Sequence, residues 1–390
     1  MLFDAPLLAF VAALVVSFVL ITTKSVHGRF TLDCVAGAQK IHSGSVPRVG
    51  GVAVVLGACA GGLLLSPASE LWWMLAASAL PAFALGLAED VTKVVGVKLR
   101  LLATVCAGVT FSLATGYSIH NLGIAPLDVV LGLPLVAVAF TGFAVGGVTN
   151  AFNIIDGCNG LAAGTALILF AAFAAIAYKV GDVQLLGATL VGMSAVAGFF
   201  VVNFPMGKLF LGDAGAYSIG FLLAAIAVAL PARNPDVSPL IGLLVLIYPV
   251  SETIYSVVRR MKRGGGAIGQ PDRLHLHSLI YKALHTVIDT SVLRNSASSV
   301  LLWGLPLISA VMAVAVARGD AELVLLATVV NIALYRAAYS IAGFAARRAS
   351  APRLLPKPTA PPKGQRPALG AQMAGAPSQT EYALADASAH

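Results

Sequence analysis

Long apolar runs recur along the whole chain, and most are long enough to cross a lipid bilayer as helices. A transmembrane helix needs roughly 17–25 predominantly apolar residues. Eleven runs approach or meet this length, at about 5–22, 47–66, 71–87, 99–115, 127–147, 161–178, 185–202, 215–231, 239–257, 299–317 and 321–342. The pattern predicts an all-α integral membrane protein with about eleven transmembrane helices.

Two segments break this apolar pattern. The longest polar loop, 259–298, separates the ninth run from the tenth. From 347 onward the chain is rich in Pro and Ala with scattered cations, a composition that cannot bury a core. We therefore predict a transmembrane domain over 1–346 and a disordered cytoplasmic tail over 347–390.

The distribution of Lys and Arg predicts the orientation in the membrane. If the N-terminus is periplasmic, all but three of the 25 cations fall in cytoplasmic loops or the tail; the exceptions are Lys179, Arg233 and Arg318. Cytoplasmic loops carry such an excess of positive charge in membrane proteins. The net charge of +8 is therefore a signal of topology. Because the cations are spread over many loops, the sequence argues against nucleic-acid binding.

Composition agrees with this class and argues against a disulfide-bonded scaffold. The chain is 58% hydrophobic and only 11% charged, with a mean hydropathy of +0.89, whereas a soluble domain is about 25% charged. Its four cysteines, Cys34, Cys59, Cys106 and Cys158, show no paired spacing. We expect free thiols.

The few polar stretches all fall on the predicted cytoplasmic side. In NAFNIIDGCNGLAAG, side-chain amides and a carboxylate recur at steps of three, at Asn150, Asn153, Asp156 and Asn159. The other stretches are GLAEDVTK, with Glu89 and Asp90, FLGDAGAYSIGF, with Asp213, and PDRLHLH, with Arg273, His275 and His277. Ionisable groups near the hydrocarbon are costly and mark functional sites.

These residue types suit a magnesium ion that holds a diphosphate. Carboxylates and amide oxygens bind Mg²⁺, which is held through one or two carboxylates together with substrate phosphates. Nearby Lys, Arg and His suit phosphate oxygens. Each stretch also has a purely structural interpretation: an Asx-turn loop, a helix N-cap at Asp213 or solvated histidines. Glu252, inside the ninth run, is better explained as a satisfied buried carboxyl than as a catalytic group.

The motifs together resemble those of a known family. VPRVGGVAV after Lys40 and His42, followed in order by the four polar stretches above, is similar to the bacterial polyprenyl-phosphate N-acetylhexosamine-1-phosphate transferases of glycosyltransferase family 4. The resemblance covers about 1–342. It implies transfer of a sugar 1-phosphate from a UDP-N-acetylhexosamine to undecaprenyl phosphate in the bacterial inner membrane. The products are an undecaprenyl-diphosphate sugar and UMP, and the cofactor is Mg²⁺, with Mn²⁺ as an alternative.

The resemblance also implies roles for individual residues. Asp213 matches the metal-binding aspartate, and Asn153 matches a polar residue beside the metal. Asp90, Asp156 and His275 match catalytic positions. Residues that match substrate-binding positions are Asn159 and Phe210 for uracil, Arg273 and His277 for the donor diphosphate, and Lys98 for the lipid phosphate.

Two positions depart from the family pattern. Glu89 stands where the family usually has the first of two aspartates, so the catalytic role goes to Asp90, with Glu89 as a supporting carboxylate. Asn159 occupies a position that is often Asp, and an amide can still pair with a uracil edge. The HLHS sequence resembles the branch that initiates O-antigen, common-antigen or capsule lipids.

Other functions remain open at this stage. The phospho-N-acetylmuramoyl-pentapeptide transferase of peptidoglycan synthesis is the second reading, because that branch has a run of histidines where this chain has HLHS. A secondary transporter is the third; it predicts several charged residues inside the spans, and only Glu252 clearly lies there. A transferase relative that has lost activity is the fourth. The sugar and the oligomeric state are not predicted.

Overall fold

The computed structural model describes residues 3–33, 45–65, 69–262 and 274–350, and these residues are almost entirely helical. The elements are α1 (Asp4–Thr22), α2 (Lys24–Thr31), β1 (Leu32–Asp33), β2 (Val46–Pro47), α3 (Gly50–Gly62), α4 (Ser69–Thr92), α5 (Val97–Thr115), α6 (Ala125–Leu131), α7 (Pro134–Ile155), α8 (Leu161–Val180), α9 (Val183–Asn203), α10 (Gly212–Arg233), α11 (Ile241–Val245), α12 (Ile247–Lys262), α13 (Leu276–Ala283), α14 (Ser291–Leu302), α15 (Gly304–Val316) and α16 (Ala321–Ser350).

The all-α membrane fold is confirmed. Within the described ranges, nine helices are long and apolar enough to cross a bilayer, compared with the eleven spans that the sequence predicts. The expected span 47–66 contains only the 13-residue helix α3, and the span 239–257 is divided between α11 and α12. Pro249 explains this division, because it has no N–H to donate to the carbonyl of Val245 and its ring clashes with that carbonyl. The orientation stays a prediction.

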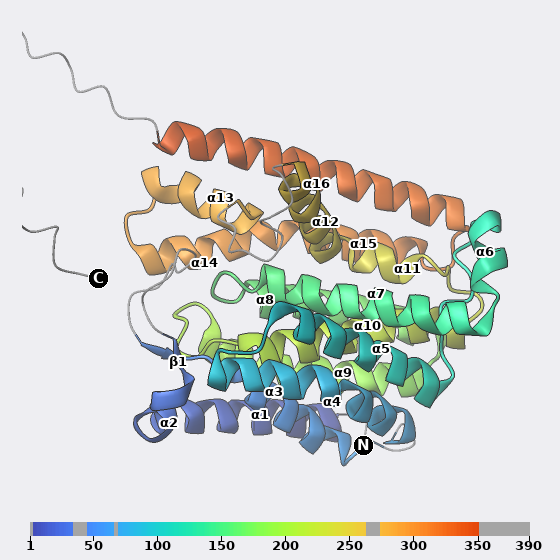
Figure 1. Ribbon diagram of the computed structural model, residues 1–390, viewed down its shortest axis with the longest axis horizontal. Coiled ribbons are helices and arrows are strands. Elements are labelled where there is room, and N and C mark those ends of the chain that lie inside the picture. Colours follow the sequence, from blue (N-terminus) through green and yellow to red (C-terminus); the bar gives the residue numbers. More distant parts are fainter. Residues whose placement is uncertain (1–2, 34–44, 66–68, 263–273, 351–390) are drawn as a thin grey trace, which may run out of the picture. The chain divides into compact units, whose positions relative to one another are not determined.

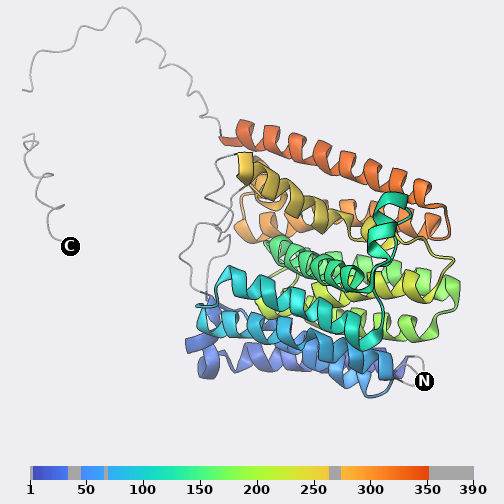
Figure 2. The ribbon, with the colours of Figure 1, turned by 45° about the vertical axis from the view of Figure 1, so that its right-hand side comes forward.

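Helix α10 is the centre of the bundle. Nearly all its residues from Gly212 to Leu230 are buried, and it packs against α3, α4, α7 and α8 (Figures 1 and 2). Small residues allow the closest approach. A Cβ at Gly51 of α3 would lie 2.2 Å from the backbone nitrogen of Gly215 in α10, so only glycine fits at this crossing.

The helices run roughly parallel, so their ends gather at two opposite ends of the bundle (Figure 1). One end, here called the site end, carries β1, α13 and α14. The antiparallel pair of β1 and β2 lies there, with Leu32 opposite Pro47. At the other end, Arg233 donates to Asp182 at 2.7 Å and Arg318 to the carbonyl oxygen of Lys179 at 3.1 Å. Lys179, Arg233 and Arg318, the three cations outside the predicted cytoplasmic loops, therefore lie at the same end of the bundle.

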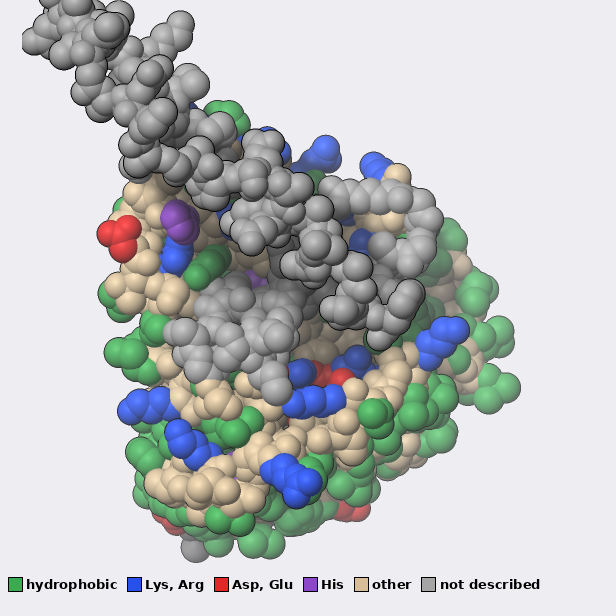
Figure 3. Space-filling view, turned by 60° about the vertical axis from the view of Figure 1, so that its left-hand side comes forward, with side chains coloured by type: hydrophobic (Ala, Val, Ile, Leu, Met, Phe, Trp, Pro, Cys, Tyr) green, Lys and Arg blue, Asp and Glu red, His purple; other side chains and the backbone are tan. Residues whose placement is uncertain are grey.

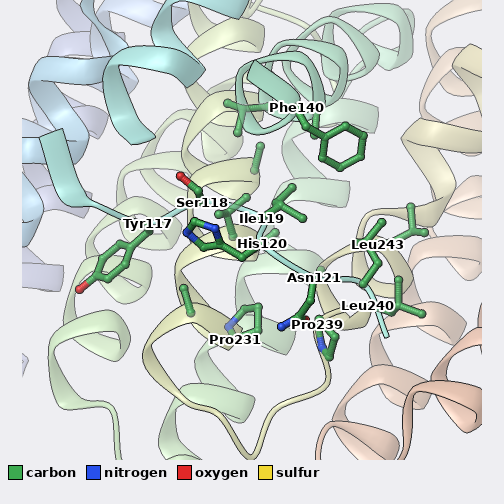
Figure 4. A pocket seen from close by; sticks show the side chains of 18 of the residues that line it. Tyr117, Ser118, Ile119, His120, Asn121, Phe140, Pro231, Pro239, Leu240 and Leu243 are labelled. Carbon is green, nitrogen blue, oxygen red and sulfur yellow. The ribbon is translucent and has the colours of Figure 1, made fainter. Parts of the chain in front are cut away.

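A cavity of about 810 Å³ opens near that opposite end. The loop 117–121 after α5 contributes Tyr117, Ser118, His120 and Asn121, and α7, α10 and α11 contribute mainly apolar side chains (Figure 4). No Asp, Glu, Lys or Arg is among the described residues that line this cavity. Its chemistry therefore does not fit a charged nucleotide.

The fit of α3 against α10 generates a stability prediction. Gly51→Ala forces the two backbones apart, which costs on the order of 1–3 kcal/mol, as for other overpacked contacts. We expect a lower midpoint of thermal unfolding in detergent. The matched control is Gly147→Ala in α7, where an added Cβ meets nothing within 4 Å. Equal midpoints for the two variants would contradict this account of the crossing.

Candidate active site

Asp90 fixes the first turn of α10. It lies near the end of α4, is 0% exposed, and its two carboxylate oxygens accept hydrogen bonds from the backbone N–H groups of Asp213 at 2.8 Å and Ala214 at 2.9 Å. These N–H groups have no partner within the helix, so the carboxylate serves as their cap. Its negative charge is also stabilised by the positive end of the helix dipole. Gly212 has φ of +75°, and a Cβ there would lie 2.5 Å from Asp90 Oδ2.

Two arginines pair with Asp213. Arg48 Nη2 donates to one carboxylate oxygen and Arg100 Nη1 to the other, and Arg48 Nε lies 3.4 Å from Asp90 Oδ1. Although burial alone lowers the pKa of the Arg48 guanidinium, the carboxylates of Asp213 and Asp90 raise it above its ordinary value. The four charges form a compact cluster, here called the Asp–Arg cluster: Asp90, Asp213, Arg48 and Arg100.

Backbone pairing holds Arg48 in the cluster. The N–H of Phe210 donates to the carbonyl of Pro47 at 2.9 Å, and the N–H of Gly50 donates to the carbonyl of Phe210 at 2.8 Å. The segment before α3 is thus joined to the segment before α10. Phe210, the predicted uracil-stacking residue, is partly buried at this junction.

The stretch between α7 and α8 lies beside the cluster. Asn153 Nδ2 donates to the hydroxyl of Tyr217, one turn after Asp213, at 3.2 Å. The Asp156 carboxylate makes no hydrogen bond with any described residue. Burial and the negative charge of Asp213 raise the pKa of its carboxyl to about 7, against the lowering effect of Arg48. Asp156 is thus a carboxylate without a direct partner beside an ionised site.

Asn159 is held by hydrogen bonds from both its side chain and its backbone. Its side-chain amide donates to the carbonyl of Pro205 at 3.1 Å, and its backbone N–H donates to Asn295 Oδ1 at 2.6 Å. Gly207, with φ of +62°, lies directly against the Asn159 amide. Asn159 therefore joins the 150–159 stretch to the loop before α10 and to α14. Its predicted contact with uracil stays a prediction.

The two histidines reach the same region from α13. Their rings are stacked with centroids 5.5 Å apart and an interplanar angle of 8°. His277 lies against Gly157, where a Cβ would be 2.2 Å from Nε2. His275 Nδ1 lies 2.9 Å from Glu252 Oε1. The histidine motif and the 150–159 stretch, more than a hundred residues apart in sequence, therefore share one site, as the motifs predict.

Other predicted residues lie at its edge or outside the description. Lys98 is exposed on the first turn of α5, and Glu89 Oε2 accepts a hydrogen bond from the N–H of Val95 at 2.8 Å. Arg273, like Lys40 and His42, lies outside the described residues. The three described cysteines are free, as expected. Figure 3 shows Lys and Arg side chains spread over the site end, with acidic and basic side chains together near its middle.

The sequence alone does not identify the partners of the aspartates. Arg48 and Arg100 lie in VPRVGG and VKLR, where their charges also fit the positive-inside pattern of cytoplasmic loops. The spacing in VKLR offered one clue: residues two apart on a helix point to nearly opposite sides, so Lys98 and Arg100 cannot both face the site. Residues four apart lie on the same face of a helix, so Tyr217 faces the same side of α10 as Asp213.

The donors fit a hard divalent cation that also binds substrate. In the described part of the chain, no three His, Cys, Asp or Glu side chains form a metal site by themselves. Mg²⁺ does not require such a cage, since it takes one or two carboxylates together with phosphate oxygens and water. Asp213, the unpaired carboxylate of Asp156 and the Asn153 amide oxygen are the side chains of this kind at the site.

Comparisons with known proteins match this arrangement. The glycosyl transferase family 4 model matches residues 72–231, a range that contains Asp90, Asn153, Asp156 and Asp213. The undecaprenyl-phosphate alpha-N-acetylglucosaminyl 1-phosphate transferase of Yersinia pestis is 31% identical over 275 residues, which cover 67% of this chain and 73% of the relative.

Two further relatives carry similar names. The corresponding Escherichia coli K12 transferase is 29% identical over 273 residues, covering 67% of this chain and 72% of the relative. A probable undecaprenyl-phosphate N-acetylglucosaminyl 1-phosphate transferase of Bacillus subtilis is 28% identical over 241 residues, covering 61% and 66%. With the buried Asp–Arg cluster on a multi-pass helical bundle, these matches show that the chain belongs to glycosyl transferase family 4, among its polyprenyl-phosphate sugar-1-phosphate transferases.

Proposed function

We propose that this protein transfers an N-acetylhexosamine 1-phosphate from a UDP-sugar to undecaprenyl phosphate and releases UMP. The reaction takes place at the cytoplasmic face of the bacterial inner membrane and initiates a cell-envelope polysaccharide. The relatives are named as transferases of N-acetylglucosaminyl 1-phosphate to undecaprenyl phosphate, which supports this class of reaction. A panel of UDP-N-acetylhexosamine donors would identify the sugar.

The observation that carries this proposal is the Asp–Arg cluster at the start of α10. A lipid phosphate and a nucleotide diphosphate are both anions, so a site that joins them must supply positive charge at the point of contact. Arg48 and Arg100 would supply it when they turn from the carboxylates to a phosphate. In the cluster, the buried carboxylates of Asp90 and Asp213 balance their charge and hold both guanidinium groups in place. The site lies at the end of membrane-crossing helices, where a lipid headgroup and a soluble nucleotide can meet.

Mg²⁺ fits this site through Asp213, with Asp156 and Asn153 beside it. When bound, it would neutralise the donor diphosphate and the departing phosphate of UMP. Each oxygen of Asp213 accepts one hydrogen bond from an arginine and keeps a lone pair for a cation. A cation there would weaken the pairing of Asp213 with Arg48 and Arg100 and favour pairing of these arginines with substrate phosphates.

The attacking group needs little activation. A phosphate monoester has a second pKa of about 6, so the lipid phosphate is largely dianionic at neutral pH. One of its oxygens attacks the phosphorus that bears the sugar, and the bond from that phosphorus to the bridging oxygen breaks, with this oxygen leaving on UMP. Asp90 is fully buried and holds two backbone N–H groups, so we assign it to positioning Asp213, with uptake of a residual proton as a secondary role.

Direct attack by the lipid phosphate is favoured over a covalent aspartyl-phosphate intermediate. The two oxygens of Asp213 are engaged by arginines, and those of Asp90 by the start of α10. These partners stabilise the charge of each carboxylate and so make it a weaker nucleophile. Two oppositely placed arginines instead suit two anions that react with each other.

The first prediction concerns the reaction itself. Purified protein in detergent with undecaprenyl phosphate, Mg²⁺ and a panel of UDP-N-acetylhexosamines should release UMP, and a chelator should stop the release until Mg²⁺ is restored. Asp213→Asn should lower the rate roughly 10²–10³-fold, the range for loss of one group that stabilises developing charge. Asp236→Asn, an exposed aspartate at the opposite end, is the matched control. Folded wild-type protein that binds no UDP-sugar would rule out the proposal.

The second prediction separates two cations on α5. Arg100 meets Asp213, whereas Lys98 is exposed, so Arg100→Gln should lower kcat/KM for the lipid at least tenfold more than Lys98→Gln. Arg318→Gln at the opposite end controls for loss of a positive charge. A larger loss for Lys98→Gln would show that the lysine that the resemblance implies, and not Arg100, meets the lipid phosphate.

A further inference from the structure

Glu252 is a buried carboxylate whose donors all belong to the histidine segment or to the last helix. It lies in α12, is 1% exposed, and accepts hydrogen bonds from His275 Nδ1 at 2.9 Å and from the backbone N–H of Leu276 at 3.2 Å. Its other oxygen accepts from the hydroxyl of Tyr335 in α16 at 2.9 Å. The sequence-based expectation of a satisfied buried carboxyl is thus confirmed, but its partners are not arbitrary.

A second tyrosine of α16 binds the start of α13. The hydroxyl of Tyr339, one turn after Tyr335, donates to the carbonyl of Leu274 at 2.9 Å. Arg259 Nη1 of α12 donates to that hydroxyl at 3.0 Å. The start of α13 is therefore fastened at Leu274, His275 and Leu276 by two helices that the family-model match does not include.

These hydrogen bonds determine the orientation of the His275 ring. Hydrogen bonding of Nδ1 to a carboxylate fixes the orientation and tautomer of an imidazole, so that Nε2 is the nitrogen left to face a ligand. The ring also stacks on His277, which lies against Gly157 of the 150–159 stretch. A continuous series of contacts thus runs from Tyr335 through Glu252 and both histidines to the stretch that contains Asp156.

We propose that Glu252, held by Tyr335 of α16, is a positioning residue that orients His275 toward the donor diphosphate. The inference rests on the proposed function, since it assigns a role within the same site. It extends the site to α12, which carries the buried carboxylate of Glu252, and to α16, which carries the buried hydroxyl of Tyr335. His275 would touch substrate, and Glu252 and Tyr335 would act through it.

The test is a double-mutant cycle on UMP release. Glu252→Gln should lower kcat at least tenfold, with KM for the UDP-sugar changed less than threefold, because the orientation of His275 matters most as UMP departs. His275→Asn should show a similar loss. In the double variant the two losses should not multiply, since Glu252 acts through His275. A merely structural Glu252 would instead lower activity by the same factor in either background, and that result would overturn the inference.

A second pair of variants guards against misfolding of Glu252→Gln. Tyr335→Phe removes only the hydroxyl and should lower kcat about three- to tenfold. Tyr255→Phe is the matched control, since this ring packs 5.9 Å from that of Tyr335 but its hydroxyl makes no hydrogen bond with a described residue. Equal rates for wild type and Tyr335→Phe, with UMP release by wild type intact, would refute the positioning role alone. An inactive wild type would refute both proposals.

Discussion

Burial of the Asp90 carboxylate in an apolar helical bundle is the constraint on which the site depends. An ionised group taken from water into such surroundings is stable only if it is paired and fully hydrogen-bonded. Here the partners are the first N–H groups of α10 and the guanidinium of Arg48. The hydrogen bonds that Asp90 accepts fix the start of α10. Asp213, in that first turn, lies between two arginines.

Two groups of helices converge on the 150–159 stretch. From one side, α4, α5, α10 and the segment between β2 and α3 supply the Asp–Arg cluster. From the other, α12 and α16 fasten the start of α13, which brings His277 against Gly157. The stretch itself comprises the end of α7 and the turn that leads to α8. A donor that binds there would contact carboxylate, amide, guanidinium and imidazole groups, the set that phosphate oxygens and a divalent cation require.

The class of fold follows from the sequence because apolar length is a local signal: runs of about twenty apolar residues leave few alternatives to membrane-crossing helices. The structure brings the motifs at Asp90, Asp156, Asp213 and His275 to one end of the bundle, and the roles of these residues stay predictions. The break near Leu246 and the short α3 were missed, since hydropathy does not register helix geometry. The pairing of Arg48 and Arg100 with Asp213 joins residues more than a hundred positions apart, which no local pattern specifies.

The most direct test of the central claim follows the phosphorus atom that bears the sugar. A UDP-N-acetylhexosamine labelled with ³²P only in its sugar-linked phosphate is incubated with the protein, Mg²⁺ and undecaprenyl phosphate, and lipid and nucleotide products are separated. Direct transfer of a sugar 1-phosphate predicts that the label moves into the lipid together with the sugar, and that the nucleotide product is unlabelled UMP. Label retained in UDP, with the sugar alone on the lipid, would contradict the account.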